Sequence, residues 1–541
     1  MKKISLYCLS IVAALLIFAP ISAQEATSVP TQEAASTPWW NNRVFYEVFV
    51  RSFYDSNGDG IGDLQGLIQK LDYLNDGDPT TTSDLGVTGL WLMPIMASPS
   101  YHGYDSTDFK AVNPDYGMND DFKQLIQAAH QRGIAVIVDL VVNHTSDQHP
   151  WFKASAAGDP KYANWYIWDD KAPSYRGPWG EQVWYPLAGR FFYAIFCGCQ
   201  PDLNYQNPDV TAAMDDVAHY WLTDMGADGF RLDALQHIIE DGQKQQDTPA
   251  TRQWATTFHQ YIDSVKPDAL TVGEVNNSDF VSAAYVPGGS DLTFDFDLAN
   301  AMVNTAKQGT NNNVISLQKR VNGLSPAGQY AAFLTNHDQP RVMTDLSGST
   351  DKAKVAANLL MTQPGVPFIY YGEEIGMQGA KPDERLRTPM QWDSTPSMGG
   401  FTSGQPWEAL QSDASTLNVA AQTDDSDSLL SHYRDLIHLR AAHPALQNGD
   451  FTPVKSASNH VYSFVRHNDL ETLLVVINLS GDAVSDYGLT LDKGISSKQA
   501  TLVEGTGDLA QPTLKADGGF SDYLPLAELA PDSLTVIQFT S

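Results

Sequence analysis

Cysteine is scarce in this sequence, with three residues in 541, at positions 8, 197 and 199. Cys8 lies in the N-terminal segment, so only Cys197 and Cys199 remain for the rest of the chain. Two cysteines are too few for a disulfide framework or a four-ligand zinc site. A bridge across the single residue between them would be strained. Two partly buried thiols and one bridge therefore stand as equal alternatives.

Basic residues are also few: 33 Lys and Arg stand against 64 Asp and Glu, which gives a formal net charge of -31. An anionic surface of this strength repels nucleic acid and anionic lipid. We therefore expect no nucleic-acid partner. The charge is compatible with a neutral substrate and with bound cations.

Long hydrophobic runs are absent after the first residues. The N-terminus, "MKKISLYCLSIVAALLIFAPISA", has a charged start and an apolar stretch over 4–19, which is shorter than a membrane span requires. It is typical of a secretory signal peptide over 1–23, cleaved after Ala23. Residues 24–38 are rich in Ala, Thr, Ser, Pro and Glu and predict a flexible linker. We expect a secreted monomer, extracellular or periplasmic, with no membrane attachment after cleavage.

The mature chain is too long for one ordinary core, so two or three domains are expected. Short β-rich runs alternate with amphipathic helical stretches, which favours parallel βα units. Eight such runs predict an α/β fold of the (β/α)₈ TIM-barrel type. A doubly wound open sheet is the alternative, but no G-x-G-x-x-G follows the first run. The predicted strands lie within 44–53, 87–95, 134–144, 227–234, 269–275, 292–298, 330–338 and 366–374.

Two stretches depart from this alternation. About 60 aromatic-rich residues follow the third predicted strand, too many for an ordinary βα loop, and predict a small inserted domain over 144–205. From 447 to 541 the pattern becomes alternating strands separated by turns, which predicts a C-terminal antiparallel β-sandwich. The barrel would then consist of 39–143 and 206–446.

The stretch "GFRLDALQH" at 229–237 places two charges inside a predicted buried strand. Arg231 and Asp233 are two residues apart, so both side chains point to the same side of the strand. Burying an unpaired charge is costly, so they either neutralise each other or belong to a polar site. Further polar residues follow other predicted strands, and the carboxyl ends of barrel strands converge on one site. The converging residues are His144, Arg231, Asp233, Glu274, His337 and Asp338.

Convergent carboxylates without a nucleophilic Ser or Cys motif indicate glycoside hydrolysis, in which one carboxylate attacks the sugar and another protonates the leaving oxygen. Asp233 fits the nucleophile because the neighbouring Arg231 lowers its pKa. Glu274, in the apolar "LTVGEV", fits the general acid because desolvation raises its pKa. Asp338 would bind substrate hydroxyls. Unrelated salt bridges at a barrel rim are the structural alternative.

The chain resembles the α-amylase family of retaining glycoside hydrolases over about residues 39–541. Four segments typical of that family occur in order, and a fifth precedes the second of them. They are "DLVVNH" (139–144), "QPDLNY" (200–205), "GFRLDALQH" (229–237), "GEV" (273–275) and "FLTNHD" (333–338).

The resemblance implies Asp233 as nucleophile, Glu274 as acid/base and Asp338 as transition-state stabiliser. It also implies that Tyr104 stacks on the sugar whose bond is cut. The substrate contacts that it implies are Tyr104, Asp105, His144, Arg231 and His337.

Two calcium sites are expected. The loop "DSNGDGIGD" places oxygen ligands at alternate positions, as a loop around a hard cation does; it is not an EF-hand, and a solvated acidic turn is the alternative. Its ligands would be Asp55, Asn57, Asp59, the Ile61 carbonyl and Asp63. Related family members carry a calcium loop of this pattern. The resemblance implies a second Ca²⁺ between barrel and inserted domain at Asn143, Asp202 and the His237 backbone, while Gln236 replaces a usual substrate-binding lysine.

The bond that is cut is predicted from details of these segments. Ala234 after the nucleophile resembles α-1,4-acting members, whereas "QPDLN" and "RTPMQWD" (387–393) resemble the oligo-1,6-glucosidase branch. Exo-acting members of that branch carry an arginine where this chain has Asp383, four residues before Arg387. We expect an endo-acting α-amylase on starch and maltooligosaccharides. An exo-acting α-glucosidase or oligo-1,6-glucosidase is the alternative. A non-catalytic carbohydrate-binding relative would be expected to lack a catalytic acid.

Overall fold

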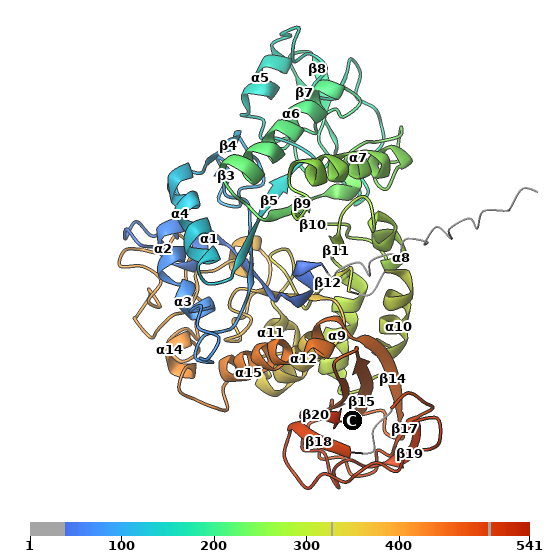
Figure 1. Cartoon of the computed structure of the whole chain (residues 1–541). Coiled ribbons are helices and arrows are strands. Elements are labelled where there is room, and N and C mark those ends of the chain that lie inside the picture. Colours follow the sequence, from blue (N-terminus) through green and yellow to red (C-terminus); the bar gives the residue numbers. More distant parts are fainter. Residues whose placement is uncertain (1–37, 326–327, 496–498, 541) are drawn as a thin grey trace, which may run out of the picture. The chain divides into compact units, whose positions relative to one another are not determined.

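The computed structural model describes residues 38–325, 328–495 and 499–540 (Figure 1). The predicted signal peptide (1–23) and the predicted linker up to residue 37 lie outside the described residues. Within the described ranges, no helix has the length and apolar character needed to cross a bilayer.

Eight parallel strands form the predicted barrel, each inside its predicted range. They are β1 (Phe45–Val48), β2 (Gly89–Leu92), β5 (Ala135–Val141), β9 (Gly229–Asp233), β10 (Leu270–Gly273), β11 (Leu292–Thr293), β12 (Ala331–Phe333) and β13 (Val366–Tyr370). Their order in the sheet is β11-β10-β9-β5-β2-β1-β13-β12. A parallel bridge between Phe294 and Ala331 joins the two edges and closes the barrel. The predicted fold class is confirmed.

Helices cover the outside of these strands (Figure 1). The longer ones are α4 (Asn119–His130), α6 (Pro208–His219), α7 (Pro249–Val265), α9 (Phe296–Gln308), α10 (Val314–Leu324), α12 (Thr350–Thr362) and α15 (Leu429–Ala442). The shorter ones are α1 (Val50–Phe53), α2 (Leu64–Gln69), α3 (Leu71–Leu74), α8 (Asp279–Ser282), α11 (Val342–Asp345), α13 (Asp383–Leu386), α14 (Val419–Gln422) and α16 (Pro444–Asn448).

Helix α7 illustrates how the sequence determines these elements. Thr248 caps it by accepting a hydrogen bond from Thr251 N, and Pro249 occupies the first turn, where its missing N–H costs nothing. Trp254, Phe258 and Ile262 recur every four residues and are buried. The helix therefore packs one apolar face against the barrel.

The barrel interior changes from apolar to charged along the strands. Phe45, Trp91, Ile137, Val272 and Phe368 belong to one buried apolar cluster inside the barrel. Residues two positions further along a strand point to the same side, so the next inward layer carries charge. In that layer lie Glu47, Asp139 and, paired in register with Asp139, Arg231.

Gly229 lies at the start of β9, where the strand passes close to its neighbour. A Cβ atom there would lie 2.0 Å from the carbonyl oxygen of Leu270. Only glycine allows this approach, which sets the register that carries Arg231 and Asp233 inward.

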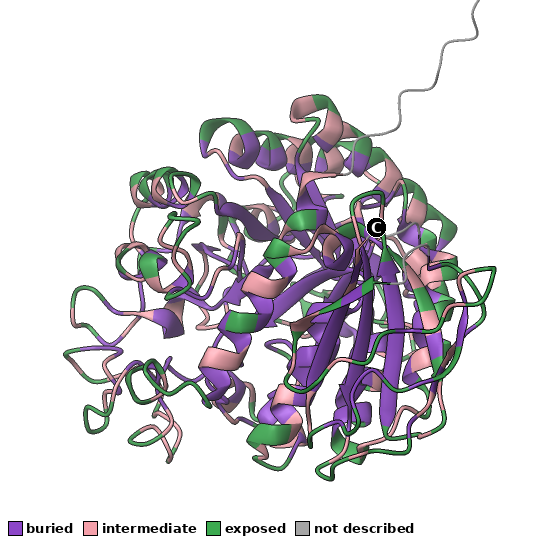
Figure 2. Cartoon of the chain, turned by 60° about the horizontal axis from the view of Figure 1, so that its bottom comes forward, coloured by how far each residue is buried: buried purple, intermediate pink, exposed green. Residues whose placement is uncertain are grey.

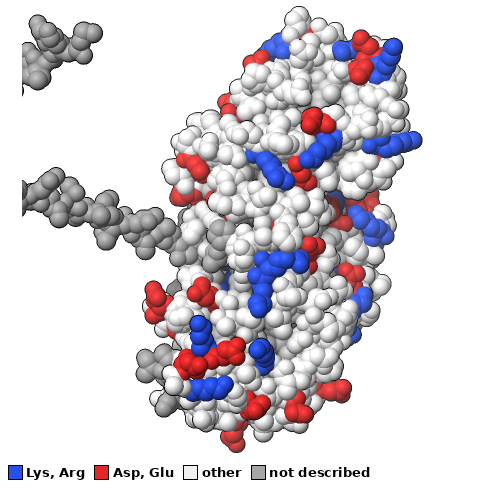
Figure 3. All heavy atoms as spheres, turned by 90° about the vertical axis from the view of Figure 1, so that its right-hand side faces the viewer, with Lys and Arg blue, Asp and Glu red and all other residues white. Residues whose placement is uncertain are grey.

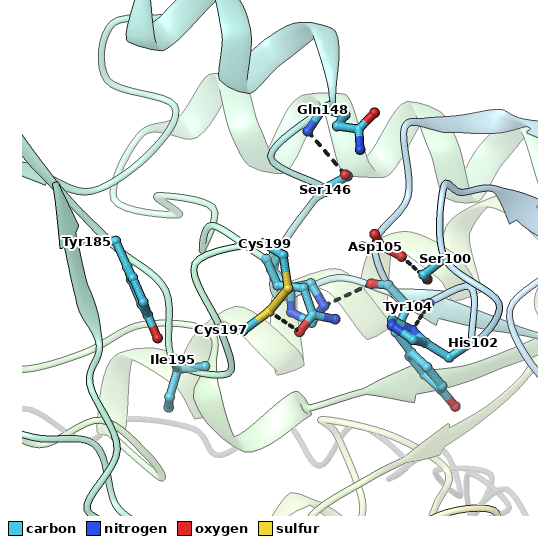
Figure 4. The surroundings of a disulfide bond; sticks show 12 residues. Ser100, His102, Tyr104, Asp105, Ser146, Gln148, Tyr185, Ile195, Cys197 and Cys199 are labelled. Carbon is cyan, nitrogen blue, oxygen red and sulfur yellow. Dashed lines mark hydrogen bonds between the residues drawn. A yellow bond between two sulfur atoms is a disulfide. The ribbon is translucent and has the colours of Figure 1, made fainter. Parts of the chain in front are cut away.

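The inserted domain contains α5 (Pro150–Ala156) and a three-stranded antiparallel sheet in the order β6 (Trp168–Asp169), β8 (Arg190–Tyr193), β7 (Trp184–Leu187). It returns to the barrel beside β5, where Leu203 N donates to Asn143 O at 2.9 Å. Cys197 and Cys199 form a disulfide with a Cα–Cα distance of 5.2 Å (Figure 4). Of the two alternatives, the structure contains the bridge.

The C-terminal domain is antiparallel, as predicted. Its strands are β14 (Asp450–Ser456), β15 (Val461–His467), β16 (Thr472–Asn478), β17 (Leu489–Leu491), β18 (Gln499–Glu504), β19 (Phe520–Tyr523) and β20 (Leu534–Thr540), in the order β18-β20-β16-β15-β14-β17-β19. The first part of β14 pairs with β15 and its end pairs with β17, and the strands enclose their own apolar cluster. Figure 2 shows long buried stretches along these strands.

Acidic and basic side chains are interspersed on the face shown in Figure 3. That face shows no continuous basic surface.

Candidate active site

A cavity of about 280 Å³ opens at the carboxyl ends of the barrel strands. It contains the three predicted catalytic acids together. Its lining consists of His102, Tyr104, His144, Phe196, Gln200, Asp233, Glu274, Asp338, Asp383 and Arg387. The side chains come from separate strand ends and from the inserted domain, as a barrel active site requires.

Arg231 lies beneath the cavity floor and joins three carboxylates. Its Nη1 lies 2.9 Å from Asp139 Oδ1 and 2.5 Å from Asp233 Oδ1, and its Nη2 lies 2.8 Å from Glu274 Oε2. The guanidinium is almost completely buried, with 1% of the side chain exposed. The charges inside the strand are therefore paired, and they belong to the polar site.

The pKa of Asp233 is raised, and the prediction of a lowered value is wrong. Burial raises the pKa of this carboxyl by more than Arg231 lowers it, and the charge of Asp338 raises it further. The prediction counted the arginine without the desolvation that accompanies it. For Glu274 the predicted direction is confirmed: burial raises the pKa, Arg231 opposes it, and Asp233 adds to the rise.

Ala234, the residue after Asp233, has left-handed backbone angles of φ 50° and ψ 33°. This conformation is uncommon for a residue with a side chain. It turns Ala234 N toward Glu274, where it donates to Oε2 at 3.0 Å. The turn therefore places the proposed acid against the end of the strand that carries the proposed nucleophile.

Asp338 is held by two cationic groups. Arg387 Nη2 lies 2.8 Å from its Oδ1, and His337 Nε2 lies 3.4 Å from its Oδ2. Burial alone would raise the pKa of Asp338, but the combined attraction of His337 and Arg387 lowers it. This carboxylate is therefore ionised at neutral pH.

A hydrogen-bonded chain runs behind the cavity from Glu47 to Asp139. His337 Nδ1 donates to Glu47 Oε1 at 2.5 Å, and its Nε2 lies 2.7 Å from the Tyr104 hydroxyl, which donates to Asp139 Oδ2 at 3.0 Å. Burial opposes the charge on His337, yet Asp338 and Glu47 raise its pKa overall. With both ring nitrogens bound to acceptors, the imidazolium form is stabilised.

The five predicted substrate contacts divide into two groups. Tyr104 and His144 line the cavity, whereas Arg231 and His337 lie behind its lining. Asp105 also lies outside the lining, where its Oδ1 accepts hydrogen bonds from the hydroxyls of Ser98, at 2.7 Å, and Ser100. Figure 4 shows Tyr104, Asp105 and Ser100 near the disulfide.

His144 is neutral in this site. Burial lowers its pKa to about 4. Its Nε2 donates to Tyr104 O at 2.9 Å, and Asn143 Nδ2 donates to its Nδ1 at 3.3 Å. The tautomer is thus fixed with the hydrogen on Nε2.

Several functional residues were not predicted from the sequence. Asp139 begins "DLVVNH" and Arg387 begins "RTPMQWD". Both residues therefore lay in segments typical of the family and could have been predicted as site residues. Glu47 carried no such signal, because its partner is distant in the chain. The other unpredicted residues of the lining are His102, Phe196, Gln200 and Asp383.

In the predicted calcium loop, the carboxylate oxygens accept hydrogen bonds from nearby residues of the same segment. Asp55 accepts hydrogen bonds from Asn57 N, Gly58 N and Gly60 N, and Asp63 accepts from Ser56 and Gly66. The described residues contain no group of three or more His, Cys, Asp or Glu positioned to hold a metal ion. An oxygen-only donor set nevertheless fits a hard cation.

At the predicted second site, Asn143 and Asp202 lie together. Asn143 Nδ2 donates to Asp202 Oδ2 at 3.1 Å, while the buried Oδ1 of Asn143 has no hydrogen-bond partner among the described residues. Burial raises the pKa of Asp202 to about 8. The imidazole of His237 points elsewhere and donates from Nδ1 to Gln245 O at 2.9 Å. A buried amide oxygen without a partner in the described part of the chain, beside an acidic side chain that a bound cation would hold in its ionised form, fits a cation ligand set.

Comparison with known proteins agrees with this geometry. The family described as "Alpha amylase, catalytic domain" matches residues 47–449. "Alpha-amylase 3" of Dictyoglomus thermophilum is 39% identical over 82% of this chain and 86% of its own length, and the "Oligo-1,6-glucosidase" of Heyndrickxia coagulans is 32% identical over 83% and 93%. The crystal structure of an α-amylase from H. orenii superposes with a TM-score of 0.79 at 40% identity, covering 92% of this chain and 99% of that one.

Proposed function

The chain belongs to the α-amylase family of glycoside hydrolases, and from this membership we propose that it is a secreted, endo-acting α-amylase. It hydrolyses α-1,4-glucosidic bonds of starch and maltooligosaccharides with retention of configuration. The observation that carries the proposal is the joint placement of Asp233, Glu274 and Asp338 around one cavity, the first two on the same guanidinium.

The mechanism gives Glu274 and Asp233 different roles. Glu274, whose pKa is raised by burial, donates its proton to the glycosidic oxygen while an Asp233 oxygen attacks the anomeric carbon. The leaving chain departs with that proton, and a glycosyl ester forms on Asp233. Glu274 then removes a proton from water, and the water oxygen attacks the anomeric carbon. The bond to Asp233 breaks, which releases the Asp233 carboxylate and leaves Glu274 protonated again.

Arg231 and Asp338 support these steps by charge. Arg231 remains in contact with Asp233 and Glu274, so it favours the ionised nucleophile and the carboxylate that forms when Glu274 gives up its proton. Asp338, ionised through His337 and Arg387, faces the positive charge that develops on the sugar ring.

Endo action is supported by the hydrogen bonds of Asp105 and the ion pairs of Arg387. Asp105 accepts hydrogen bonds from Ser98 and Ser100, and Arg387 is paired with Asp338 and with Asp383 at 3.5 Å. These contacts occupy Asp105 Oδ1 and Arg387 Nη2, two groups that could otherwise bind the end of a sugar chain. The exo-acting alternative is favoured by one observation, the similarity to oligo-1,6-glucosidases.

A maltoheptaoside blocked at its non-reducing end separates the two functions. An endo-acting α-amylase cleaves the blocked and the free sugar at similar rates. An exo-acting α-glucosidase cleaves only the free sugar and releases glucose. Cleavage restricted to the unblocked sugar would therefore overturn the endo assignment.

We also propose that the protein binds Ca²⁺ as a structural ion. Asp55, Asp59 and Asp63 lie within nine residues, and no Lys, Arg or His of the described chain forms an ion pair with any of them. Asn57 and the Ile61 carbonyl would complete the ligands of this loop. Asn143, Asp202 and the His237 backbone would hold a second ion. A bound cation would neutralise the loop and join the inserted domain to the barrel.

A further inference from the structure

Trp179 is an unusual surface residue. It belongs to the inserted domain and is 61% exposed, and no other tryptophan of the described residues is exposed to this degree. Its ring stacks against Phe196 with centroids 5.8 Å apart and planes inclined by 25°. Its other neighbour is the ring of His237, at 5.5 Å. Leaving so large an apolar ring in water is unfavourable unless a ligand covers it.

Phe196 connects Trp179 to the active site. It lines the cavity together with Glu274, and its ring lies 5.3 Å from that of His144. Phe196 is itself 37% exposed. An apolar surface thus continues from the cavity wall through Phe196 to the outer face of Trp179.

The turn that carries Trp179 is fixed by its own hydrogen bonds. Trp179 N donates to Glu181 Oε2 at 2.9 Å, and Gly177 N donates to Glu181 O at 3.0 Å. A Cβ atom on Gly177 would lie 1.4 Å from Glu181 Oε1, so a larger residue there would displace the carboxylate that binds Trp179 N. Gln245 Nε2 also donates to Arg176 O at 2.8 Å, which ties the turn to the barrel. The exposed ring is therefore positioned before any ligand binds.

The disulfide holds the second ring. Cys197 directly follows Phe196, and its bridge to Cys199 closes the loop between two lining residues, Phe196 and Gln200 (Figure 4). Both aromatic side chains are consequently carried by constrained segments, which reduces the entropy lost when a ligand covers them.

The contacts show on which side of the cleaved bond these rings lie. His237, which touches Trp179, ends the short helix that begins one residue after Ala234, whose N–H holds Glu274. Arg387 joins Asp338 to Asp383, and all three residues also line the cavity. Glu274 protonates the leaving oxygen, so the side of the cavity next to Glu274 receives the leaving part of the substrate.

We propose that Phe196 and Trp179 form a stacking platform for the leaving part of an α-glucan, with Phe196 beside the first glucosyl unit after the cleaved bond and Trp179 beside the next. This inference rests on the proposed hydrolase function and specifies its substrate. Trp179 is then a specificity-determining residue. It favours substrates that extend at least two units beyond the cut, as endo action on long chains requires.

Two substrates with different leaving groups test the platform. Maltoheptaose extends over the leaving side, whereas α-maltosyl fluoride has only a fluoride ion there. Trp179→Ala should lower kcat/KM for maltoheptaose about tenfold, because the variant loses the ring on which the sugar stacks. The same variant should hydrolyse α-maltosyl fluoride within about twofold of the unsubstituted protein.

The first control is Trp179→Phe, which keeps a stacking ring and should retain most of the maltoheptaose activity. The second control is Leu187→Ala, which removes another exposed apolar side chain of the inserted domain. Leu187→Ala should alter neither rate. An equal loss on both substrates in Trp179→Ala, or unchanged maltoheptaose activity, would overturn the platform. If the unsubstituted protein hydrolyses neither substrate, the proposed function itself fails, so the two failures are distinct.

Discussion

Arg231 Nη2 lies 2.8 Å from Glu274 Oε2, so the guanidinium that contacts the proposed nucleophile also contacts the proposed acid. Sequence spacing linked Arg231 only with Asp233, its neighbour on one strand. Because Arg231 touches both acids, a proton lost from Glu274 leaves a carboxylate that is already paired with a cation. The same contact limits how far burial can raise the pKa of Glu274.

Replacing the nucleophile should abolish turnover and leave the fold intact. Asp233→Asn keeps an oxygen acceptor for Arg231 but cannot form the glycosyl ester, so we expect kcat to fall at least about 10³-fold. The melting temperature should stay near that of the unsubstituted protein. The matched control is Asp216→Asn, which alters an exposed carboxyl paired with Lys110 and should leave kcat unchanged. Substantial turnover by Asp233→Asn would remove Asp233 from this role.

The pH profile of kcat/KM should report Glu274 on its basic side. The acid acts only when protonated, and its folded pKa is raised, so activity should decline as the pH rises through that raised value. With α-maltosyl fluoride, whose leaving group departs without a proton, the unsubstituted protein should lack this basic limb, and Glu274→Gln should keep more of its kcat/KM than it does with maltoheptaose. A basic limb that is the same with both substrates would assign it to another group.

Glu47 should act as a positioning residue for His337. Glu47→Gln removes the anion that helps to raise the pKa of His337, so the imidazolium would lose its proton at lower pH. We expect kcat/KM to fall about tenfold at pH 7.5 and less at pH 5.5, since a hydrogen bond to a charged group contributes about 1.5–3 kcal/mol. Glu374→Gln alters another buried carboxyl, one bound to the Tyr46 and Tyr73 hydroxyls, and should not change the pH profile. A pH-independent loss in Glu47→Gln would indicate a structural role only.

Removal of calcium should destabilise the protein. An ion that binds only the folded state stabilises it by about 2.7 kcal/mol at a concentration of 100 Kd, so a strong chelator should lower Tm by several degrees. Asp55→Asn should bind one ion fewer than the unsubstituted protein in equilibrium dialysis, and Asp202→Asn likewise. If chelation leaves Tm unchanged and dialysis finds no bound ion, both sites are wrong.

The strands were predictable because each is a short apolar run between turn residues, and local pattern suffices for that. The predicted strands were too long at ends where the N-terminal cap of a helix stops the strand. The run "LTFDFDL" ends as a strand after Thr293, because the Asp295 side chain accepts from Leu298 N and begins α9. Similarly, "VRSF" after β1 forms the short helix α1.

At the site, sequence order identified the acids but not their electrostatics. Asp139 and Arg231 are neighbours in register between β5 and β9, a pairing that arises from the strand order of the folded sheet. Glu47 lies in β1 and reaches His337 after β12, with β13 between the two strands in the sheet. The degree of burial, which reverses the expected pKa shift of Asp233, also depends on packing that no local pattern contains. Trp179 likewise gains its significance only from its position beside Phe196.

The most direct test of the mechanism is the anomeric configuration of the sugar first released from maltoheptaose, followed by proton NMR before mutarotation. Displacement by Asp233 and then by water inverts the anomeric carbon twice, so the new reducing end should appear as the α-anomer. Initial release of the β-anomer would mean a single displacement by water, and it would contradict the assignment of Asp233 as the nucleophile.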